Sequence, residues 1–343
     1  MARPYGAAVQ RRVRIERLDP VTADEATCAA YAGLLASARG AVTPIGLPVS
    51  KAYVLNRARN YSGNMRNHLW VAYDGDAMVG AIEMSWAEAP DNRDRAWVHH
   101  DIPPANVTPE LAEALLGAAA AYAAGFGRTI LTLEVEVGSA LSAWLRDRGG
   151  RPGSVDQHNV LRLASVSRAD VAALAAATPD GYEAIVVDGP IPDDLLVAYT
   201  ELTHSMNDAP RDDLTTEDAV FSPERVRLWE DGVARRGHLL WTVIARETAT
   251  GELAGFNQLV IRTDWPEVVE NADTGVSRAH RGHGIGLWIK AVNLLRVLDG
   301  LPDAVCVETW NAASNGHMLR VNRRLGFVPE HELESWELVG VPA

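Results

Sequence analysis

The sequence predicts an α/β protein, with strands and helices mixed along the chain, that consists of two consecutive copies of one unit. Three observations support this prediction. A glycine-rich loop lies between a strand and a helix in the C-terminal half, a β-hairpin signal occurs once in each half, and corresponding landmarks of the two halves are separated by a nearly constant distance. The chain of 343 residues is long enough for two domains, each with its own core.

The glycine-rich loop covers residues 276–286, which read V-S-R-A-H-R-G-H-G-I-G. It follows a strand-like run at 270–277 and precedes apolar residues at helical spacing over 287–298. Glycines leave room for successive backbone N–H groups to converge on an anion at a helix N-terminus, and Arg281 adds a positive charge. The loop therefore predicts a phosphate-binding cradle, although a turn that only joins strand to helix is the simpler alternative. Its three glycines are Gly282, Gly284 and Gly286.

The elements after the cradle continue the pattern. Gly300 and Pro302 end the helix, a short apolar run follows at 304–307, and a second helical pattern at 315–324 is closed by Gly326. The predicted order is strand, cradle, helix, strand, helix.

In this order and spacing the sequence resembles the GNAT superfamily of acetyl-CoA-dependent N-acetyltransferases. The family's cradle motif is Val-x-x-x-x-Arg/Gln-x-x-Gly-x-Gly/Ala, and its second motif is Asn-x-x-Ala, then a Tyr seven positions after the Asn and Gly-Phe four beyond. The resemblance implies two tandem GNAT folds, each a mixed, mostly antiparallel central sheet flanked by helices. The cradle motif is matched by Val276, Arg281, Gly284 and Gly286, and the second motif falls on Asn315, Met318, Asn322 and Gly326-Phe327.

The resemblance also implies which residues bind acetyl-CoA. The backbone of 281–286 would hold its pyrophosphate, and the end of the preceding strand would bind its pantetheine arm. The family's tyrosine, which protonates the departing coenzyme A thiolate, is replaced by Asn322, whose amide cannot release a proton. The implied cofactor-binding residues are Gly275, Val276, Ser277, Arg281, Gly282, His283, Gly284, Ile285, Gly286, Asn315 and Asn322.

Candidate catalytic bases lie on the strand that enters the cradle. An acceptor amine must lose a proton before it attacks a thioester, and Asp273 and Glu270 are the two candidates, with Asp273 closer to the thioester end. Three residues apart, they would point to opposite faces of a regular strand, and a β-bulge, frequent here in the family, would change that. Glu308 is a third candidate. An ordered water as base, or an exposed and ion-paired role for each carboxylate, is the alternative.

Acceptor recognition in the family comes largely from the loop between the first two helices, here residues 206–218. Its five carboxylates would attract a cationic amine, or they belong to a solvated stretch that caps a helix starting at 215–218. Trp265, Trp310 and Trp336 either line the acceptor pocket or fill the core. The candidate acceptor-binding residues are Asp208, Asp212, Asp213, Glu308 and Trp310.

The first half repeats the elements of the second half without its cradle. Gly80 and Gly255, which follow the two hairpin turns, are 175 positions apart. In place of the cradle the first half has H-H-D-I-P-P-A-N at 99–106, where two prolines remove N–H donors. The sequence predicts a degenerate GNAT-like domain at 1–166 and an acetyl-CoA-binding domain at 180–343. His99, His100 and Asp101 lack the spacing of a metal site, and no bound metal is predicted.

Composition limits the partners. The formal net charge of −13 argues against nucleic acid or an anionic membrane and suits a small cationic substrate. Only two cysteines, Cys28 and Cys306, are present, and no signal-peptide-like stretch opens the chain, so a cytoplasmic protein is expected. The apolar run at 114–126 is too short to span a bilayer. A homodimer is compatible with these observations.

The combined prediction is an acyltransferase of the N-acetyltransferase type. It would move an acetyl group from acetyl-CoA to the amine of a small cationic molecule, such as a natural product or an antibiotic, by direct attack in a ternary complex. One alternative is a GNAT-fold protein that binds coenzyme A or a metabolite without transfer. A distant alternative is an NAD(P)-dependent oxidoreductase, although the loop reads Gly-x-Gly-x-Gly and not Gly-x-Gly-x-x-Gly.

Overall fold

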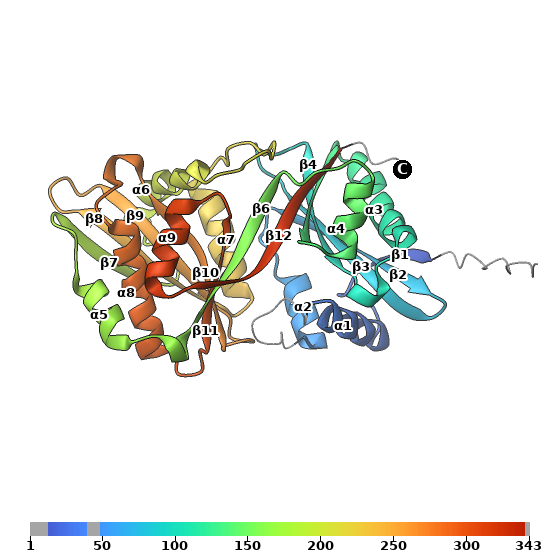
Figure 1. Ribbon diagram of the computed structural model, residues 1–343, viewed down its shortest axis with the longest axis horizontal. Coiled ribbons are helices and arrows are strands. Elements are labelled where there is room, and N and C mark those ends of the chain that lie inside the picture. The colour runs from blue at the N-terminus through green and yellow to red at the C-terminus, as the bar shows by residue number, and fades with distance from the viewer. Residues whose placement is uncertain (1–12, 40–48, 340–343) are drawn as a thin grey trace, which may run out of the picture.

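The computed structural model describes residues 13–39 and 49–339, which form one 12-stranded, mostly antiparallel sheet with helices on both faces (Figure 1). The start of the chain, where a targeting signal was considered, lies partly outside these residues. Within them, no helix combines the length and apolarity needed to cross a bilayer. Both cysteines are free and buried.

The first half begins with a strand, two helices and a hairpin, of which the sequence analysis predicted the hairpin. Ser50 and Thr108 cap two of its helices by accepting from backbone N–H groups of Tyr53 and Leu111. Its elements are β1 (Arg14–Leu18), α1 (Glu25–Arg39), α2 (Lys51–Arg59), β2 (Met65–Asp74), β3 (Ala77–Ala87), β4 (Arg95–Asp101), η1 (Pro104–Asn106), α3 (Pro109–Ala124), β5 (Ile130–Glu136), α4 (Ala140–Asp147) and β6 (Ser154–Arg162).

The second half repeats this order after η2 (Leu163–Ser165) and the short helix α5 (Arg168–Ala176). Every residue of its strand β9 is buried, including the polar Asn257 and Gln258. Its elements are β7 (Tyr182–Asp188), α6 (Asp193–Thr203), η3 (His204–Asp208), α7 (Pro223–Arg235), β8 (Leu239–Glu247), β9 (Leu253–Ile261), β10 (Val268–Val276), η4 (Arg278–His280), α8 (Ile285–Gly300), β11 (Cys306–Ala312), α9 (Gly316–Leu325) and β12 (Val328–Val339).

The last strand of each half pairs with the sheet of the other half. β6 is antiparallel to β11, β12 is antiparallel to β5, and β6 and β12 also pair with each other. Figure 1 shows these two strands crossing between the halves. The sequence analysis predicted neither strand. The predicted domain boundary, 1–166 and 180–343, stays a prediction: it lies around α5, and this strand pairing crosses it in both directions.

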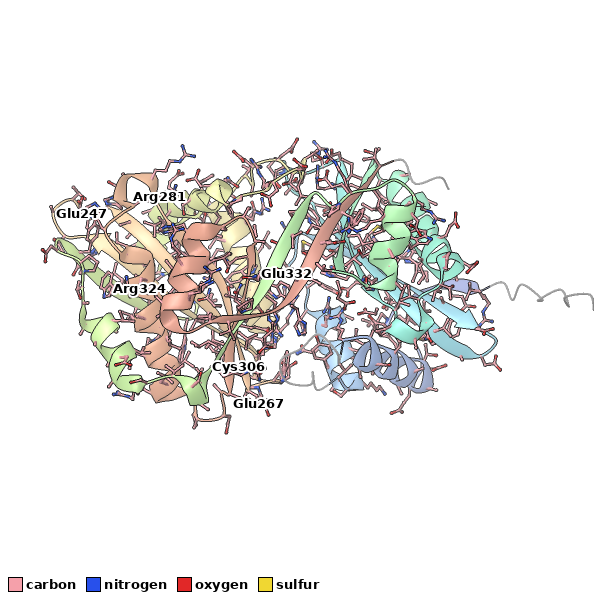
Figure 2. The ribbon with its side chains drawn as sticks, in the orientation of Figure 1. Glu247, Glu267, Arg281, Cys306, Arg324 and Glu332 are labelled. Carbon is pink, nitrogen blue, oxygen red and sulfur yellow. The ribbon has the colours of Figure 1, made fainter. Side chains whose placement is uncertain are left out.

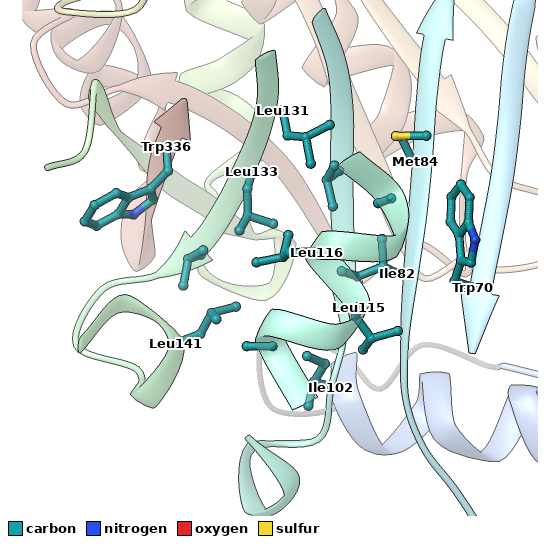
Figure 3. Packing of buried hydrophobic residues seen from close by; sticks show 14 of the residues in the cluster. Trp70, Ile82, Met84, Ile102, Leu115, Leu116, Leu131, Leu133, Leu141 and Trp336 are labelled. Atoms are coloured by element: carbon teal, nitrogen blue, oxygen red, sulfur yellow. The ribbon is translucent and has the colours of Figure 1, made fainter. Parts of the chain in front are cut away.

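This strand exchange carries apolar side chains into the core of the opposite half. Trp336 of β12 is 1% exposed and packs with Leu133, Leu141 and their neighbours in the first half (Figure 3). In the same way, Leu161 of β6 packs in the second half with Val269, Val307 and their neighbours. Because a buried tryptophan contributes one of the largest apolar areas in a core, each half depends on the other for stability.

The predicted helix start at residues 215–218 is wrong. Helix α7 begins at Pro223, after Ser222, whose Oγ accepts from the N–H of Arg225 at 3.1 Å. The preceding polar groups bind other segments: Thr215 donates to Glu337, and the Glu217 carboxylate accepts from the N–H of Asn92. Cross-chain hydrogen bonds therefore use the side chains that resembled a helix cap.

The exchange can be tested with Trp336→Ala. Removing this side chain leaves a cavity in the first-half core, so the free energy of unfolding should fall by about 3–5 kcal/mol. Val339→Ala on the same strand is the control, because Val339 is 71% exposed and its change should stay within about 0.5 kcal/mol. Denaturant unfolding followed by circular dichroism measures both. Equal effects of the two variants would contradict burial of β12 in the first half.

Candidate functional site

The cradle, residues 276–286, is an open turn between β10 and α8. Gly282 and Gly284 have φ of +86° and +81°, and no atom lies within 4 Å of where a Cβ would stand at either position. In the described part of the chain no carbonyl or side chain accepts from the N–H groups of Gly282, His283 and Gly284. The first turn of α8 adds N–H groups without intrahelical partners. The turn is thus a suitable site for an anion.

Two arginines at the cradle share one carboxylate. The guanidinium groups of Arg278 and Arg281 both contact Asp208, with Arg281 Nη2 at 2.6 Å from Oδ2, and Arg281 Nε donates to the carbonyl of Val276 at 3.1 Å. Figure 2 shows Arg281 at this end of the second half. Hydrogen bonds from Arg278 and then Arg281 lower the pKa of Asp208. The Asp208 charge therefore stabilises the loop around the cradle.

Strands β10 and β11 separate beside the cradle. Their parallel ladder ends at the pair Glu270–Glu308, although β10 continues to Val276 and β11 to Ala312. The space between the strands beyond this pair, called the opening below, lies at the carboxyl end of both strands. The resemblance places the pantetheine arm along this part of β10.

A β-bulge in β10 produces the separation. Asn271 pairs with Leu259 and Thr274 with Asn257, so Ala272 and Asp273 together face the single residue between those partners. Asn271 and Thr274 turn to the α8 side, where both bond to Asn257. Glu270 and Asp273 then share the other face, toward α6 and α7. The conditional expectation of a bulge is confirmed, and the opposite-face geometry of a regular strand does not apply.

The two candidate bases differ in their partners. Glu270 is held by Arg262, with Oε2 and Nη2 at 2.5 Å. No described residue forms a hydrogen bond or an ion pair with the half-buried Asp273 carboxylate, and burial, followed by the charge of Glu270, raises the pKa of Asp273 to about 6. Burial and then Asp273 raise the pKa of Tyr199 on α6. Of the two carboxylates, Asp273 is the one free to take a proton.

The first half contributes a side chain to this face. His158 on the exchanged strand β6 is buried, and its Nε2 lies 3.1 Å from Oε2 of Glu308. Its ring stacks on Trp310 at 4.3 Å, and Arg262 lies 4.0 Å from Glu308. Sequence analysis missed His158, because only the pairing of β6 with β11 brings it to the second half. A chain Glu270–Arg262–Glu308–His158 thus borders the opening.

The sequence matches no model of a protein family and no curated protein. Solved structures match it over nearly its whole length. A tandem GNAT protein from the clavulanic acid biosynthesis pathway, solved without AcCoA, is 26% identical, covers 96% of this chain and 99% of its own, and has a TM-score of 0.77. The chain therefore has the fold of a tandem GNAT protein.

Two further structures share the fold at lower identity. A GCN5-related N-acetyltransferase from Sphaerobacter thermophilus is 17% identical, with 98% of each chain covered and a TM-score of 0.69. One from Kribbella flavida is 16% identical, with 83% of this chain and 92% of that chain covered and a TM-score of 0.50. The mostly antiparallel sheet of this chain differs from the doubly wound parallel sheet that the oxidoreductase alternative requires.

The residues present at the cradle fit acetyl-CoA. Two buried polar atoms without a described partner, Oγ of Ser277 and Oδ1 of Asn322, belong to residues that the resemblance assigns to the cofactor. The amides, phosphates and hydroxyl of acetyl-CoA offer partners for such atoms and for the free N–H groups of the cradle. Asn315 has a structural role as well, because its Oδ1 accepts from the N–H of Met318 at the start of α9.

Two of the other predicted cofactor-binding residues, Gly275 and Ile285, are needed for packing. A Cβ at Gly275 would lie 2.3 Å from Oγ of Ser205, so no larger residue fits where η3 crosses β10. Ile285 is buried in the core, which leaves its backbone N–H for the cradle. His283 lies beside the ring of Tyr182. Asn322 donates from Nδ2 to Oδ1 of Asn311 at 2.7 Å.

The predicted acceptor residues are not brought together in one cluster. Asp213 lies near the first half, with its N–H bonded to the carbonyl of Gly153 and its carboxylate 3.7 Å from Arg151. Asp212 is exposed. Trp265 and Trp336 are core residues, whereas Trp310 is 41% exposed beside His158 and Glu308. Glu308 and Trp310 are therefore the predicted acceptor residues that border the opening.

The first half of the chain has a cavity of its own. It is about 670 Å³, lies between α1, α2 and β2, and contains a partly buried pair in which Arg57 Nη2 is 2.7 Å from Glu83 Oε2. Sequence analysis gave no signal for it. Among the described residues, no group of three or more His, Cys, Asp or Glu side chains could hold a metal ion, and His99, His100 and Asp101 belong to β4.

Gly284→Val tests the cradle. A β-branched residue at φ +81° costs roughly 1–2 kcal/mol and places methyl groups where the anion would lie, so acetyl-CoA binding should fall below detection. Gly251→Val in the β8–β9 turn is a matched control, with φ +78° and the same free surroundings. Calorimetric titration of both variants measures the difference. Binding retained by Gly284→Val would refute the cradle assignment.

Proposed function

We propose that the second half transfers an acetyl group from acetyl-CoA to the amine of a small, cationic molecule. The observation that carries this proposal is the Asp273 carboxylate, which has no described hydrogen-bond or ion-pair partner. Asp273 belongs to the bulge beside the opening, three residues before Val276, where the cradle begins. A cofactor site and a free base on adjoining parts of one strand are what acetyl transfer to an amine requires.

The cofactor would be held mainly by backbone groups. The N–H groups of 282–286 would bind its pyrophosphate, the free edge of β10 near Val276 its pantetheine arm, and Asn315 and Asn322 its other side. When bound, acetyl-CoA supplies a thioester carbonyl that an amine can attack. Gly275 and Ser277 shape the strand end from which this carbonyl would receive backbone hydrogen bonds.

Asp273 is the base in this proposal. With a pKa of about 6 it is mainly ionised at neutral pH, yet basic enough to take a proton from the attacking amine. Glu270 is held by Arg262 and raises the pKa of Asp273, so it acts as a positioning residue. Cys306 is an unsuitable acyl carrier because burial, followed by Glu308, raises the pKa of its thiol to about 11. This supports direct attack.

The acceptor would lie on the face toward α6 and α7. Three carboxylates border it, Glu270, Asp273 and Glu308, and their charge favours an ammonium group. The stacked rings of Trp310 and His158 would form one side of the acceptor pocket, so residues of both halves would contribute to this pocket. Of the other predicted acceptor residues, Asp208 and Asp213 are paired with arginines, so the exposed Asp212 would be the one to attract the cation at longer range. The neighbour from the clavulanic acid biosynthesis pathway supports a natural product or antibiotic as acceptor.

We propose that the partner is a small molecule in the cytoplasm and that the protein binds neither nucleic acid nor a membrane. The chain is also compatible with a homodimer. The net charge of −13 supports this choice of partner. A second candidate function is cofactor or metabolite binding without transfer. It is favoured by one observation, the amide of Asn322 at the position of the family's tyrosine acid.

Calorimetric titration with acetyl-CoA tests the proposal, with NAD and NADP as controls. One acetyl-CoA per chain is expected, because the first half has no cradle. Two per chain would refute the degenerate first half, and no binding, or a preference for a dinucleotide, would refute the function. A panel of amines assayed for thiol release then separates transfer from binding alone.

Asp273→Asn should lower kcat by about 100-fold or more, because the amide cannot accept the proton. In the wild type, activity should rise with pH through about 6, since the base works only when deprotonated. Thiol release measured from pH 5 to pH 8 gives this profile. Glu270→Gln is the control: it removes the charge that raises the pKa of Asp273, so the midpoint should move to lower pH while activity persists. Full activity of Asp273→Asn at neutral pH would exclude this residue as the base.

A further inference from the structure

Lys290 on α8 is a buried amine without a partner of opposite charge. Its side chain is 3% exposed, and no hydrogen bond or ion pair joins it to any described residue. Its Nζ lies 5.4 Å from the centre of the Phe327 ring. Burying an unpaired ammonium group lowers the stability of a fold. Packing alone therefore does not account for a lysine at this position, and a functional role does.

The position of Lys290 connects it to the opening. It lines a cavity of about 10 Å³, roughly the space of one water molecule, together with Asn271 of the bulge and Val307 of β11. Val307 is part of the last stretch of the β10–β11 ladder, and Asn271 is the first residue beyond it. Lys290 therefore lies on the α8 side of the place where the two strands separate.

The same helix holds the cradle. Lys290 is six residues after Gly284, which corresponds to about 9 Å along the helix axis. Its cavity also contains Leu325, which lies one turn after Asn322 on α9. The cavity that Lys290 lines thus lies on the α8 side of the sheet, between the bulge of β10 and the end of α9.

We propose that Lys290 is the proton donor to the coenzyme A sulfur, in place of the tyrosine that this chain lacks at position 322. The inference rests on the proposed function and adds to it the residue that completes proton transfer. Asn322 is unsuited to the task, because its Nδ2 is bonded to Asn311 and an amide does not release a proton.

The proposed step balances in protons and electrons. The amine nitrogen forms a bond to the acetyl carbon, and the bond from that carbon to sulfur breaks with its electron pair on sulfur. Lys290 Nζ gives one proton to the sulfur and becomes a neutral amine, while Asp273 takes the proton that the nitrogen loses. Solvent then reprotonates Lys290 and accepts the proton from Asp273, so both groups return to their starting state.

The surroundings of Lys290 support this role. The other residues of the cavity, contributed by β9, β10, β11, α8, the end of α9 and Phe327, are all uncharged: Leu259, Asn271, Leu294, Val297, Val307, Leu325 and Phe327. Burial lowers the pKa of Lys290 to about 7. Since a free thiol has a pKa of about 8.5, proton transfer from this ammonium group to a thiolate is favourable. Activity should consequently fall as the pH rises above about 7, when Lys290 loses its proton.

Binding of coenzyme A tests the proposal without turnover. Coenzyme A and desulfo-coenzyme A are titrated calorimetrically into the wild type, Lys290→Met and Lys290→Arg at pH 6 to pH 9. At pH 6, where Lys290 carries its proton, the wild type should bind coenzyme A about tenfold more tightly than desulfo-coenzyme A, because the ammonium group donates a hydrogen bond to the sulfur. Lys290→Met should lose this preference. Methionine is close in volume and removes a buried charge, so its thermal midpoint should not fall.

Steady-state rates provide the second readout. Lys290→Met should lower kcat by about 100-fold or more and lose the fall in activity above about pH 7, while the rise through about pH 6 from Asp273 persists. Lys290→Arg should keep the preference for the thiol and still be slow, because a guanidinium group does not give up its proton.

The outcomes separate the two proposals. Equal binding of coenzyme A and desulfo-coenzyme A by the wild type, or an unchanged preference and rate in Lys290→Met, would overturn the role of Lys290 and leave the cofactor site intact. A wild type that binds neither compound would overturn the proposed function, and with it this inference.

Discussion

The structure depends on backbone hydrogen bonds between strands of one half and strands of the other half. β5 and β11 each need a partner on their second edge, and the partner comes from the opposite half: β12 for β5 and β6 for β11. A strand left without this partner would expose a row of N–H and C=O groups. The exchange joins the sheets of the two halves into one 12-stranded sheet. It also brings His158 next to Glu308, so the proposed acceptor pocket needs both halves.

The bulge in β10 is the second constraint, and it links local backbone geometry to chemistry. By adding one residue opposite a single partner, it turns Asp273 to the face of Glu270 and lets β11 move away from β10. Polar groups then occupy both sides of one strand. On one side the unpaired Asp273 faces the acceptor region, and on the other Asn271 lies beside Lys290. In the proposed mechanism, proton acceptance and proton donation therefore take place on opposite faces of the sheet.

Local chemistry made much of this predictable from the sequence. Turn residues predicted both hairpins, and Gly282 and Gly284 predicted the cradle because their backbone conformation favours glycine. The exchanged strands were missed because their partners are far away along the chain, and no local pattern encodes a choice between β5 and β11. His158 was missed with them. Lys290 was overlooked because a lysine within an apolar helix is usually exposed, and its burial follows only from the packing of Phe327 and β11.

The exchange has a consequence for synthesis on the ribosome. β5 ends at Glu136, whereas its outer partner β12 begins at Val328, roughly 190 residues later. At about 5–20 residues per second, the edge of β5 waits on the order of 10–40 seconds for the last strand to emerge. During this interval the nascent first half presents an open strand edge and an unfilled place for Trp336. Translation speed and chaperone access therefore bear on the yield of folded protein as directly as the stability of the finished chain.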